Sequence, residues 1–257
     1  MYIQNEYVDR KISLNLKNVS KKYVQPHSNR IHTVLDNINI QILEGEIVTI
    51  LGKSGCGKST LLNLIAGFEH SYGGEILLNG NPVKDISPER IMMFQESALF
   101  PWLTAFQNIE IALKMAKIPK DQREEIVMHY LEIVGLSEYS SSYIHQLSGG
   151  MKQRVALARA LSLNPKILLM DEPFAALDIT IKKSLYQELL ALHTKHKKTI
   201  LFVTHNINEA VLLGDRVIVM SPQIFGIKKE YVIDIPKEQR SDNNPIIKNI
   251  INQITSD

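Results

Sequence analysis

Residues 52–60 read Gly52-Lys53-Ser54-Gly55-Cys56-Gly57-Lys58-Ser59-Thr60 and fit the phosphate-binding pattern G-x-x-x-x-G-K-[ST]. The loop follows an apolar run, residues 47–51, that predicts a buried strand, and precedes residues 60–66, whose apolar spacing predicts a helix ending at Gly67. Glycines let the backbone curl so that N–H groups face phosphate oxygens, and the helix adds its positive end. We therefore predict a nucleotide site formed by these residues, in which Lys58 neutralises the outer phosphates and Ser59 binds Mg²⁺.

Composition places the chain among ordinary globular proteins. Its 257 residues are 44% apolar and 22% charged, which is enough to bury a substantial core. Lys and Arg total 29 against 27 Asp and Glu, and there is no long polybasic run, so nucleic-acid binding is not supported. The densest basic patch, Lys195–Lys198, is interpreted as a solvated helix end. The single cysteine, Cys56, excludes an internal disulfide and is interpreted as a small spacer in the loop.

The sequence predicts a protein that is soluble and contacts a membrane only through a partner. Residues 1–13 carry Glu, Asp, Arg and Lys without an apolar block, so they do not resemble a secretory signal. No apolar stretch approaches the roughly 20 residues that a membrane-spanning helix needs. The best candidate, residues 210–220, is interrupted by Asp215 and Arg216.

Periodicity predicts an α/β fold. Strands are expected at 13–23, 35–43, 47–51, 75–78, 167–170, 199–203 and 216–220, with a tight turn at Asn79-Gly80. Helices are expected at 60–66, 108–116, 123–134 and 181–193. This predicts a parallel-sheet core interrupted by a helical insertion at about 96–161, and the family resemblance described below implies an antiparallel β subdomain as well. The predicted organisation is an N-terminal extension 1–13, an ATPase domain 14–220, and a tail 221–257 that no pattern assigns.

Two acidic residues follow the apolar strand that is predicted at 167–170. Asp171 and Glu172 follow it directly, and strand alternation sends their side chains in different directions. Asp171 suits an Mg²⁺ contact through water, and Glu172 suits the activation of a water for attack on a γ-phosphate. Such a pair is often only structural, so the prediction depends on the phosphate loop.

The segment Leu147-Ser148-Gly149-Gly150-Met151 resembles the LSGGQ signature of the ATP-binding cassette (ABC) family. A serine and two glycines before a helix can form a second anion site, with a capping hydroxyl and bare N–H groups. The resemblance implies that Ser148, Gly149 and Gly150 close over the ATP of a second copy packed head to tail. Met151 departs from the signature glutamine and offers no amide for bonding across such a dimer.

Further landmarks of this family occur in its order, and their roles are implied by the resemblance alone. Tyr23 matches the aromatic residue that stacks on adenine, and Gln95 matches the glutamine that links the metal site to the helical insertion. His205 matches the switch histidine that contacts γ-phosphate. Residues 173–178 match the D-loop, which includes Asp178 at the nucleotide and dimer interface, although Ala175 stands where Ser or Gly is commoner.

The segment 94–104, Phe-Gln-Glu-Ser-Ala-Leu-Phe-Pro-Trp-Leu-Thr, resembles the importer ATPases of the nitrate, sulfonate and taurine group. This implies an ATPase motor at the cytoplasmic face of the membrane that drives a permease, with an extracytoplasmic substrate-binding protein as an indirect partner. The sole tryptophan, Trp102, either contacts the permease or packs inside the insertion. Aliphatic sulfonate, taurine or nitrate is the expected cargo, and a vitamin or pyrimidine precursor is the alternative.

Two non-transport classes compete with this interpretation. Cassettes that act as DNA-repair clamps carry a long coiled coil between the glutamine and the signature, and residues 96–147 show no heptad run. A small-molecule kinase with a phosphate loop does not predict Leu147–Met151. The importer motor therefore remains the favoured hypothesis.

Overall fold

A computed structural model describes residues 11–24, 31–70, 72–175, 177–241 and 243–256. Most of the predicted N-terminal extension, residues 1–10, and Ala176 of the predicted D-loop lie outside these residues. The chain forms two compact units, one built from residues up to Ser87 and from Lys197 onward, and the other from Pro88–His196. The second unit is larger than the predicted insertion at 96–161, because it also holds two strands and a long helix.

The first unit contains an antiparallel sheet in the order β2-β1-β4-β5. Its strands are β1 (Ile12–Val24), β2 (Ile31–Leu43), β4 (Gly73–Leu78) and β5 (Asn81–Pro82). Apolar residues alternate along β2, so that Ile38, Ile40 and Ile42 are buried between exposed neighbours. Asn79 and Gly80 both have positive φ, at 48° and 79°, as the predicted tight hairpin turn requires.

The same unit contains the parallel strands that carry the phosphate loop. These are β9 (Arg216–Ser221), β3 (Ile47–Leu51) and β8 (Thr199–Thr204), and β10 (Gly226–Val232) adds an antiparallel strand beside β9, so the order is β10-β9-β3-β8. β3 is parallel to both β8 and β9, and all residues of β3 and β8 are buried. Helix α1 (Lys58–Ala66) follows the loop after β3 and ends at Gly67, with φ 84°, as expected.

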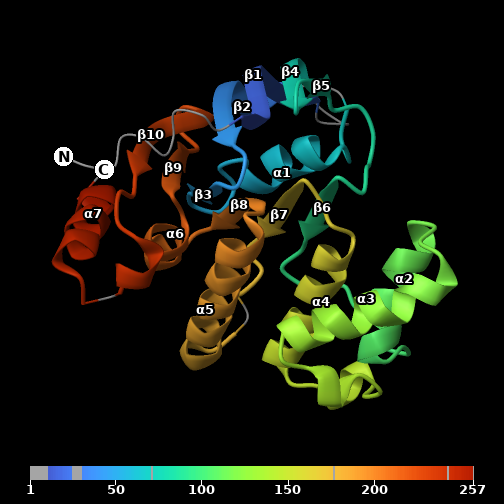
Figure 1. Ribbon diagram of the computed structural model, residues 1–257. Helices are drawn as coiled ribbons and strands as arrows, with labels where there is room; N and C mark the ends of the chain where they lie inside the picture. Colours follow the sequence, from blue (N-terminus) through green and yellow to red (C-terminus); the bar gives the residue numbers. More distant parts are fainter. Residues whose placement is uncertain (1–10, 25–30, 71, 176, 242, 257) are drawn as a thin grey trace. The chain divides into compact units, whose positions relative to one another are not determined.

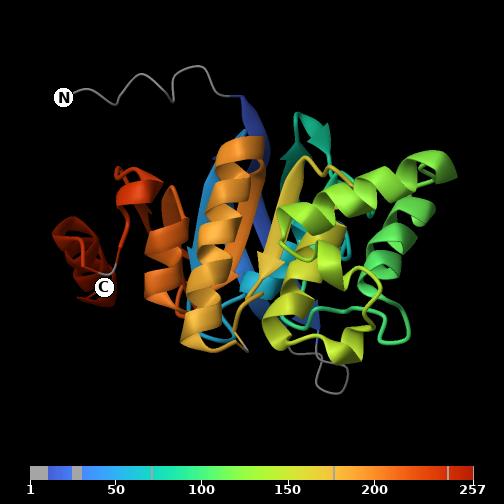
Figure 2. The same cartoon turned by 60° about the horizontal axis from the view of Figure 1, so that its bottom comes forward.

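The unassigned tail completes the core of this unit. Helix α7 (Pro245–Ser256) lies beside α6 (Ile207–Leu213) in both views (Figures 1 and 2). Its Ile247 and Ile254 join a buried cluster with Leu51 and Val211. The Arg240 guanidinium donates hydrogen bonds to backbone oxygens of the tail itself and of Gly214, which is the C-cap of α6. The tail is therefore an integral part of the unit.

The second unit combines a parallel strand pair with helices. The strands are β6 (Arg90–Met93) and β7 (Ile167–Asp171), and the helices are α2 (Ala105–Met115), α3 (Lys120–Ile133), α4 (Gly149–Ser162) and α5 (Ile179–His196). Short 3-10 turns occupy 137–139 and 144–146, and another lies at 237–239 in the first unit. α2 begins three residues earlier than predicted because Thr104 and Gln107 form a capping box.

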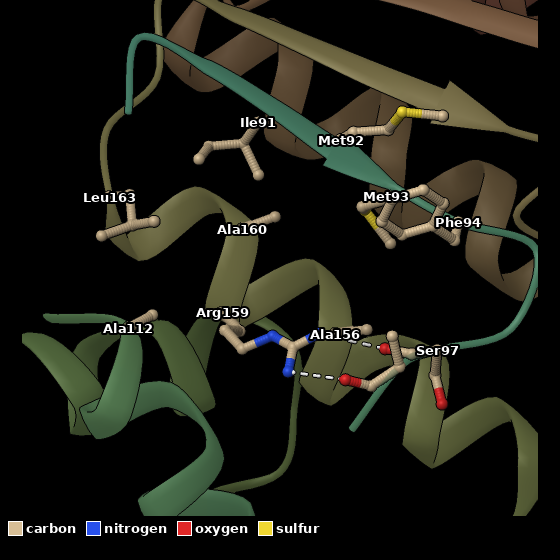
Figure 3. A pocket seen from close by; sticks show the side chains of 11 residues that line it. Ile91, Met92, Met93, Phe94, Ser97, Ala112, Ala156, Arg159, Ala160 and Leu163 are labelled. Carbon is tan, nitrogen blue, oxygen red and sulfur yellow. Dashed lines mark hydrogen bonds between the residues drawn. The ribbon is translucent and has the colours of Figure 1, made fainter. Parts of the chain in front are cut away.

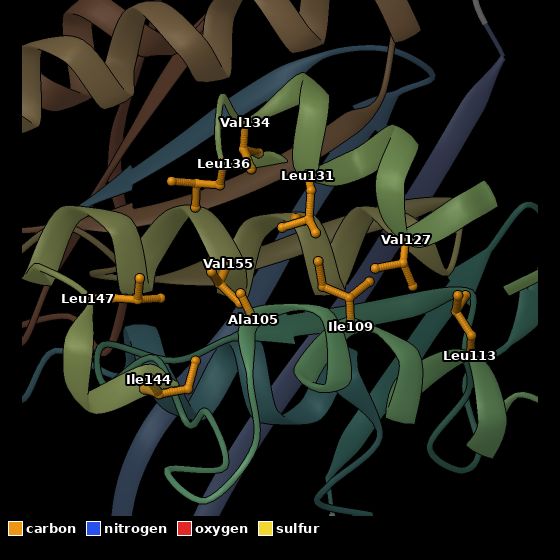
Figure 4. Packing of buried hydrophobic residues seen from close by; sticks show 11 residues of the cluster. Ala105, Ile109, Leu113, Val127, Leu131, Val134, Leu136, Ile144, Leu147 and Val155 are labelled. Carbon is orange, nitrogen blue, oxygen red and sulfur yellow. The ribbon is translucent and has the colours of Figure 1, made fainter. Parts of the chain in front are cut away.

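The helical part of this unit has its own core. Figure 4 shows side chains from α2, α3 and α4 pointing toward one another, with Ile109, Leu131 and Val155 fully buried. The expected α/β class, with parallel core, antiparallel subdomain and helical insertion, is confirmed. Across the described residues, every helix is too short or too polar to cross a membrane.

Candidate functional site

The phosphate loop is shaped by glycines and by a buried lysine. Lys58 donates from Nζ to the carbonyl oxygens of Gly52 (2.8 Å) and Lys53 (3.3 Å), so its side chain folds back over the loop. Gly57 has φ 95°, and a Cβ there would lie 2.7 Å from Leu35 Cδ2. The loop therefore adopts a backbone that only glycine can take, with a cation at its centre.

Helix α1 presents its first N–H groups toward the loop. Its N-cap is Gly57, which has no side chain to accept from these donors, and its first turn contains no acidic residue. Ser59 is exposed in this turn, whereas Cys56 is buried, as expected of a spacer. This arrangement leaves an anion-binding helix end with a hydroxyl beside it.

Tyr23 is held beside α1 by two residues that sequence reasoning missed. Its hydroxyl donates to Glu69 Oε2 (2.6 Å), which also accepts from Lys21 Nζ (2.9 Å). Lys21 Nζ lies 4.8 Å from the centroid of the Tyr23 ring. Burial alone would raise the pKa of Glu69, but the hydrogen bonds from Tyr23 and Lys21, together with the Lys21 charge, lower it.

The hydrogen bond between Tyr23 and Glu69 also acts on the phenol. Burial and the bond to Glu69 raise the pKa of Tyr23, and a side-chain hydrogen bond with Thr60 opposes this. Thr60 is the last residue of the phosphate-loop motif. The structure thus brings Tyr23 to the first turn of α1, where an exposed ring can face a base.

His205 lies at the same edge of the sheet as the loop. Leu51 of β3 pairs with Thr204 of β8 in parallel register, so Gly52 and His205 both follow the carboxyl ends of neighbouring strands. Thr204 Oγ1 donates to the buried Glu209 carboxylate (2.6 Å) and accepts from Asn206 N (3.0 Å). These bonds hold the turn that leaves His205 exposed.

Glu209 was missed by the sequence analysis, although a local signal was present. Asn206 is the N-cap of α6, and its side chain accepts from Glu209 N (3.2 Å). The spacing Asn-x-x-Glu is typical of a helix start, and it places an acid where it can reach back to the turn. The cap at Asn206 is therefore the local sequence signal that could have found Glu209.

In the second unit, parallel register brings three predicted residues to one sheet edge. Met93 pairs with Met170, so Gln95 and the pair Asp171–Glu172 follow the carboxyl ends of neighbouring strands. Glu172 has φ 45°, a left-handed conformation that is rare for a residue with a side chain. The strand therefore ends at Asp171 and Glu172 does not continue its alternation, so the different directions of the two carboxylates stay a prediction.

The signature segment forms the predicted helix start. Ser148 is the N-cap of α4, and its hydroxyl accepts from Met151 N (3.3 Å). A Cβ on Gly150 would lie 2.7 Å from Ile181 Cγ2, so glycine is required by the start of α5. Met151 packs against the helical core, which explains an apolar side chain at the position of the family's glutamine.

Asp178 serves a local structural purpose. Its Oδ1 accepts from the backbone N–H groups of Thr180 and Ile181, both at 3.0 Å, and so caps the start of α5. Leu177, its neighbour, would lie 3.3 Å from a Cβ on Gly149. The D-loop and the signature segment are thus in contact within this unit, and the role of Asp178 at a nucleotide stays a prediction.

Trp102 does not pack into the helical core. It is 69% exposed and contacts Phe100, with ring centroids 5.6 Å apart. The core instead receives Leu99 and Phe106 from this segment. The buried Asn108 amide fixes the loop by bonding to both the N–H and the carbonyl of Phe100. The interpretation that Trp102 packs inside the insertion is therefore wrong, and its contact with a permease stays a prediction.

The residues present fit Mg²⁺ held together with nucleotide phosphates. Among the described residues there is no group of three His, Cys, Asp or Glu side chains that could form a protein cage for a metal. Mg²⁺ uses few protein ligands and keeps several waters when it binds with phosphate oxygens. An exposed serine hydroxyl and a strand-end carboxylate, Ser59 and Asp171, are donors of the kind that this ion accepts.

Comparison with known proteins identifies the family of this chain. A model of the family described as ABC transporter matches residues 35–175, and an AAA domain model matches 142–211. The chain is 44% identical over 210 residues to a bicarbonate transport ATP-binding protein of Synechococcus elongatus, covering 81% of this chain and 75% of the relative. It is 41% identical over 215 residues to a nitrate import ATP-binding protein of that species, covering 82% and 78%. It is 40% identical over 218 residues to a taurine import ATP-binding protein of Roseobacter denitrificans, covering 85% and 81%.

Solved structures give the same result. A bacterial ABC transporter cassette solved as a dimer is similar with a TM-score of 0.75 and 34% identity, covering 87% of this chain and all of that one. A post-hydrolysis dimer of an ATP-binding cassette with ADP and Pi gives a TM-score of 0.74 at 33% identity, with the same coverage. With its phosphate loop, its strand-end carboxylates and its signature helix, this chain belongs to the ABC transporter family as an ATP-hydrolysing cassette.

Proposed function

We propose that the chain is the ATPase motor of an importer for a small molecule bearing an oxygen-rich negative group. The observation that carries the ATPase assignment is the buried Lys58 folded over a glycine loop at an uncapped helix start. The import assignment is supported by relatives named for bicarbonate, nitrate and taurine, which share that anionic chemistry. Aliphatic sulfonate, taurine or nitrate were the expected cargoes, and the bicarbonate relative adds a fourth candidate.

We propose that some residues of the site bind the ATP phosphates and that another takes part in proton transfer. Lys58 and the N–H groups of α1 hold the ATP phosphates, and His205 contacts the γ-phosphate. Glu172 accepts a proton from the attacking water. A general base must lie within hydrogen-bond reach of the water that it deprotonates. Mg²⁺, held by Ser59, Asp171 and Gln95, would supply charge neutralisation on the phosphate oxygens.

Tyr23 is proposed to stack on the adenine. Its ring is 38% exposed while its hydroxyl is fixed by Glu69 and Thr60, so the ring presents a face without freedom to rotate away. Base–aromatic stacking tolerates any base, because every base has a π-face. The contact would therefore add affinity for a nucleotide over bare polyphosphate.

A second copy of the chain is the proposed partner at the signature segment. One related cassette was solved as a dimer in two structures, and Ser148 caps a helix whose first turn has no acidic side chain. We propose that Ser148, Gly149 and Gly150 bind the ATP held by the other copy. In mixed dimers, Ser148→Arg in one copy should abolish hydrolysis at the phosphate loop of the other. Damage only at the mutant's own loop would refute this arrangement.

A membrane permease is the proposed partner to which the cassette transmits its conformational change. Trp102 and Phe94 leave large apolar side chains exposed on the second unit, and aromatic residues are enriched where partner surfaces meet. The proposal includes a peripheral position at the cytoplasmic face of a membrane and a substrate-binding protein that acts beyond the permease. Vitamin or pyrimidine precursors remain the alternative cargo.

Uptake measurements on a deletion strain test the cargo. Cells lacking this gene should lose uptake of one of labelled bicarbonate, nitrate or taurine, and regain it with the parent chain but not with Lys58→Ala. Loss of vitamin-precursor uptake instead would favour the alternative. Unchanged uptake of all these solutes would argue against the importer assignment, and a DNA-damage phenotype would favour a repair clamp.

A further inference from the structure

A guanidinium of the signature helix α4 is bonded to the segment that follows Gln95. Arg159 donates from Nη1 to the Ala98 carbonyl and from Nη2 to the Ser97 carbonyl, both at 3.0 Å. Figure 3 shows these two bonds as dashed lines from the Arg159 side chain. In the part of the chain that the structure describes, no ion pair involves Arg159, so its charge is directed at backbone oxygens. Burial accordingly lowers the pKa of this group.

The backbone that Arg159 holds is in an unfavourable conformation. Ala98 has φ 45°, in the left-handed region where a Cβ is crowded. Conformations of this kind persist only where surrounding contacts determine them, and they gather at clamps and switches. The two parallel N–H groups of a guanidinium fit two successive carbonyls, which a lysine ammonium cannot match. Arg159 is therefore suited to keeping the chain turned at this point.

A second side chain of α4 acts on Gln95 itself. Gln153 is 6% exposed, and its Nε2 donates to the Gln95 carbonyl oxygen at 3.2 Å. Among the described residues its Oε1 is buried without a hydrogen-bond partner. Buried amides usually bond through both of their polar atoms, and here the one bond of the Gln153 side chain goes to the Gln95 backbone.

We call the contacts of Arg159 and Gln153 with residues 95–98 the clamp. It forms one side of a pocket of about 140 Å³. Phe94, Ser97 and Ala98 line it from the segment around Gln95, and Ala156, Arg159 and Ala160 line it from α4. Ala156 and Ala160 keep this space open, because a larger side chain at either position would enter it (Figure 3). Any group that entered this pocket would contact the clamped backbone and Arg159 together.

We propose that Arg159 is a positioning residue that fixes the backbone after Gln95, and with it the Gln95 side chain, to the helix that carries Ser148. The proposal rests on the proposed function, because it concerns the geometry of Gln95 in ATP hydrolysis. Gln153 acts in the same way on the preceding carbonyl. Neither residue touches the nucleotide in this proposal.

Spin labelling of the full chain tests the clamp without relying on hydrolysis. The one native cysteine, Cys56, is buried, so an exposed Glu96→Cys is the site that a maleimide label would reach. In this background Arg159→Met should raise label mobility at position 96. An exposed label at Glu138→Cys, in the same unit, is the matched control and should keep its mobility.

Unchanged mobility at 96 would overturn the clamp, and equal increases at 96 and 138 would reduce Arg159 to a general packing role. Arg159→Lys keeps the charge and the stem, so it should fold if Arg159→Met does not, and its mobility at 96 should be intermediate. A value equal to the parent's would also count against the proposal.

Steady-state ATPase measurements then separate positioning from binding. In Arg159→Met, kcat should fall about 10–100-fold, as for a misplaced catalytic geometry, while KM for ATP stays within about twofold. Arg159→Lys should recover part of kcat. A raised KM with unchanged kcat would contradict the proposal. If the parent chain itself does not hydrolyse ATP, the proposed function fails, whereas the mobility result still decides whether the clamp exists.

Discussion

Removing one oxygen atom, in Tyr23→Phe, tests how the ring proposed to bind adenine is held. The Tyr23 hydroxyl lies 2.6 Å from Glu69 Oε2, and the same oxygen accepts from Lys21. The phenylalanine keeps the ring face but loses this anchor. Tyr23→Ala removes the ring as well, so the two variants separate orientation from stacking.

The structure sets the size of both effects. A hydrogen bond to a charged group contributes about 1.5–3 kcal/mol. Since Tyr23 is 38% exposed, solvent competes for this bond and about 1 kcal/mol is a better figure, or roughly fivefold in an equilibrium constant. Tyr23→Phe should therefore weaken ATP binding by about two- to fivefold. Tyr23→Ala loses about 1–3 kcal/mol of stacking, or roughly 5- to 150-fold.

Competition against a fluorescent ATP analogue measures the dissociation constants. Tripolyphosphate is the matched ligand, because it engages the phosphate loop and has no base. Both variants should bind it as the parent does. If Tyr23→Ala binds ATP within twofold of the parent, the ring does not contact adenine and the reasoning fails. Equal weakening for ATP and tripolyphosphate would mean that the loop itself was damaged.

Three further changes have defined outcomes. Glu172→Gln should keep ATP affinity, lower kcat about 10²–10⁴-fold and trap an ATP-bound dimer, as seen by single-turnover assay and gel filtration; normal turnover would remove Glu172 from the general-base role. Gly150→Ala should destabilise the chain by about 1 kcal/mol in urea unfolding, because a Cβ 2.7 Å from Ile181 Cγ2 outweighs the better helix propensity of alanine, and Ile181→Ala should relieve the clash. Ile247→Ala, at a fully buried position of α7, should lower the free energy of unfolding by about 2–5 kcal/mol, while Ile246→Ala, at a position 58% exposed, should change it by less than about 0.5 kcal/mol; equal effects would mean that α7 is not packed as described.

The parts of the fold that sequence predicted are those fixed by local patterns. β3 is a continuous apolar run, and the loop after it is a contiguous motif, so position and conformation follow from neighbouring residues. Of the elements that were missed, β6 and α7 were missed for opposite reasons. β6 has only four residues, too few for a period, whereas α7 has a clear apolar face in a tail where no flanking signal marked its start.

The candidate site was predicted in its motif residues and missed in the residues that hold them. Glu69 contacts Tyr23 from 46 positions away, and Arg159 contacts Ala98 from 61 positions away. A single glutamate in a loop or a single arginine on a helix has no local signature, because its partner is chosen by the packing of distant segments. Only Glu209 had such a signature, through the cap at Asn206.

Helix α4 carries the signature segment and also contacts the chain around Gln95. Ser148 caps its start, Met151 packs against the helical core, and Gln153 and Arg159 bond the backbone at Gln95 and directly after it. For Gln95 to move relative to Ser148, three side-chain-to-backbone hydrogen bonds would have to break, two of them to a charged group. Their combined contribution, about 1.5–3 kcal/mol for each bond from Arg159 and about 0.5–1.5 kcal/mol for the bond from Gln153, exceeds thermal energy severalfold. The glutamine and the signature serine therefore belong to one packed body, and a motion that displaces one of them carries the other with it.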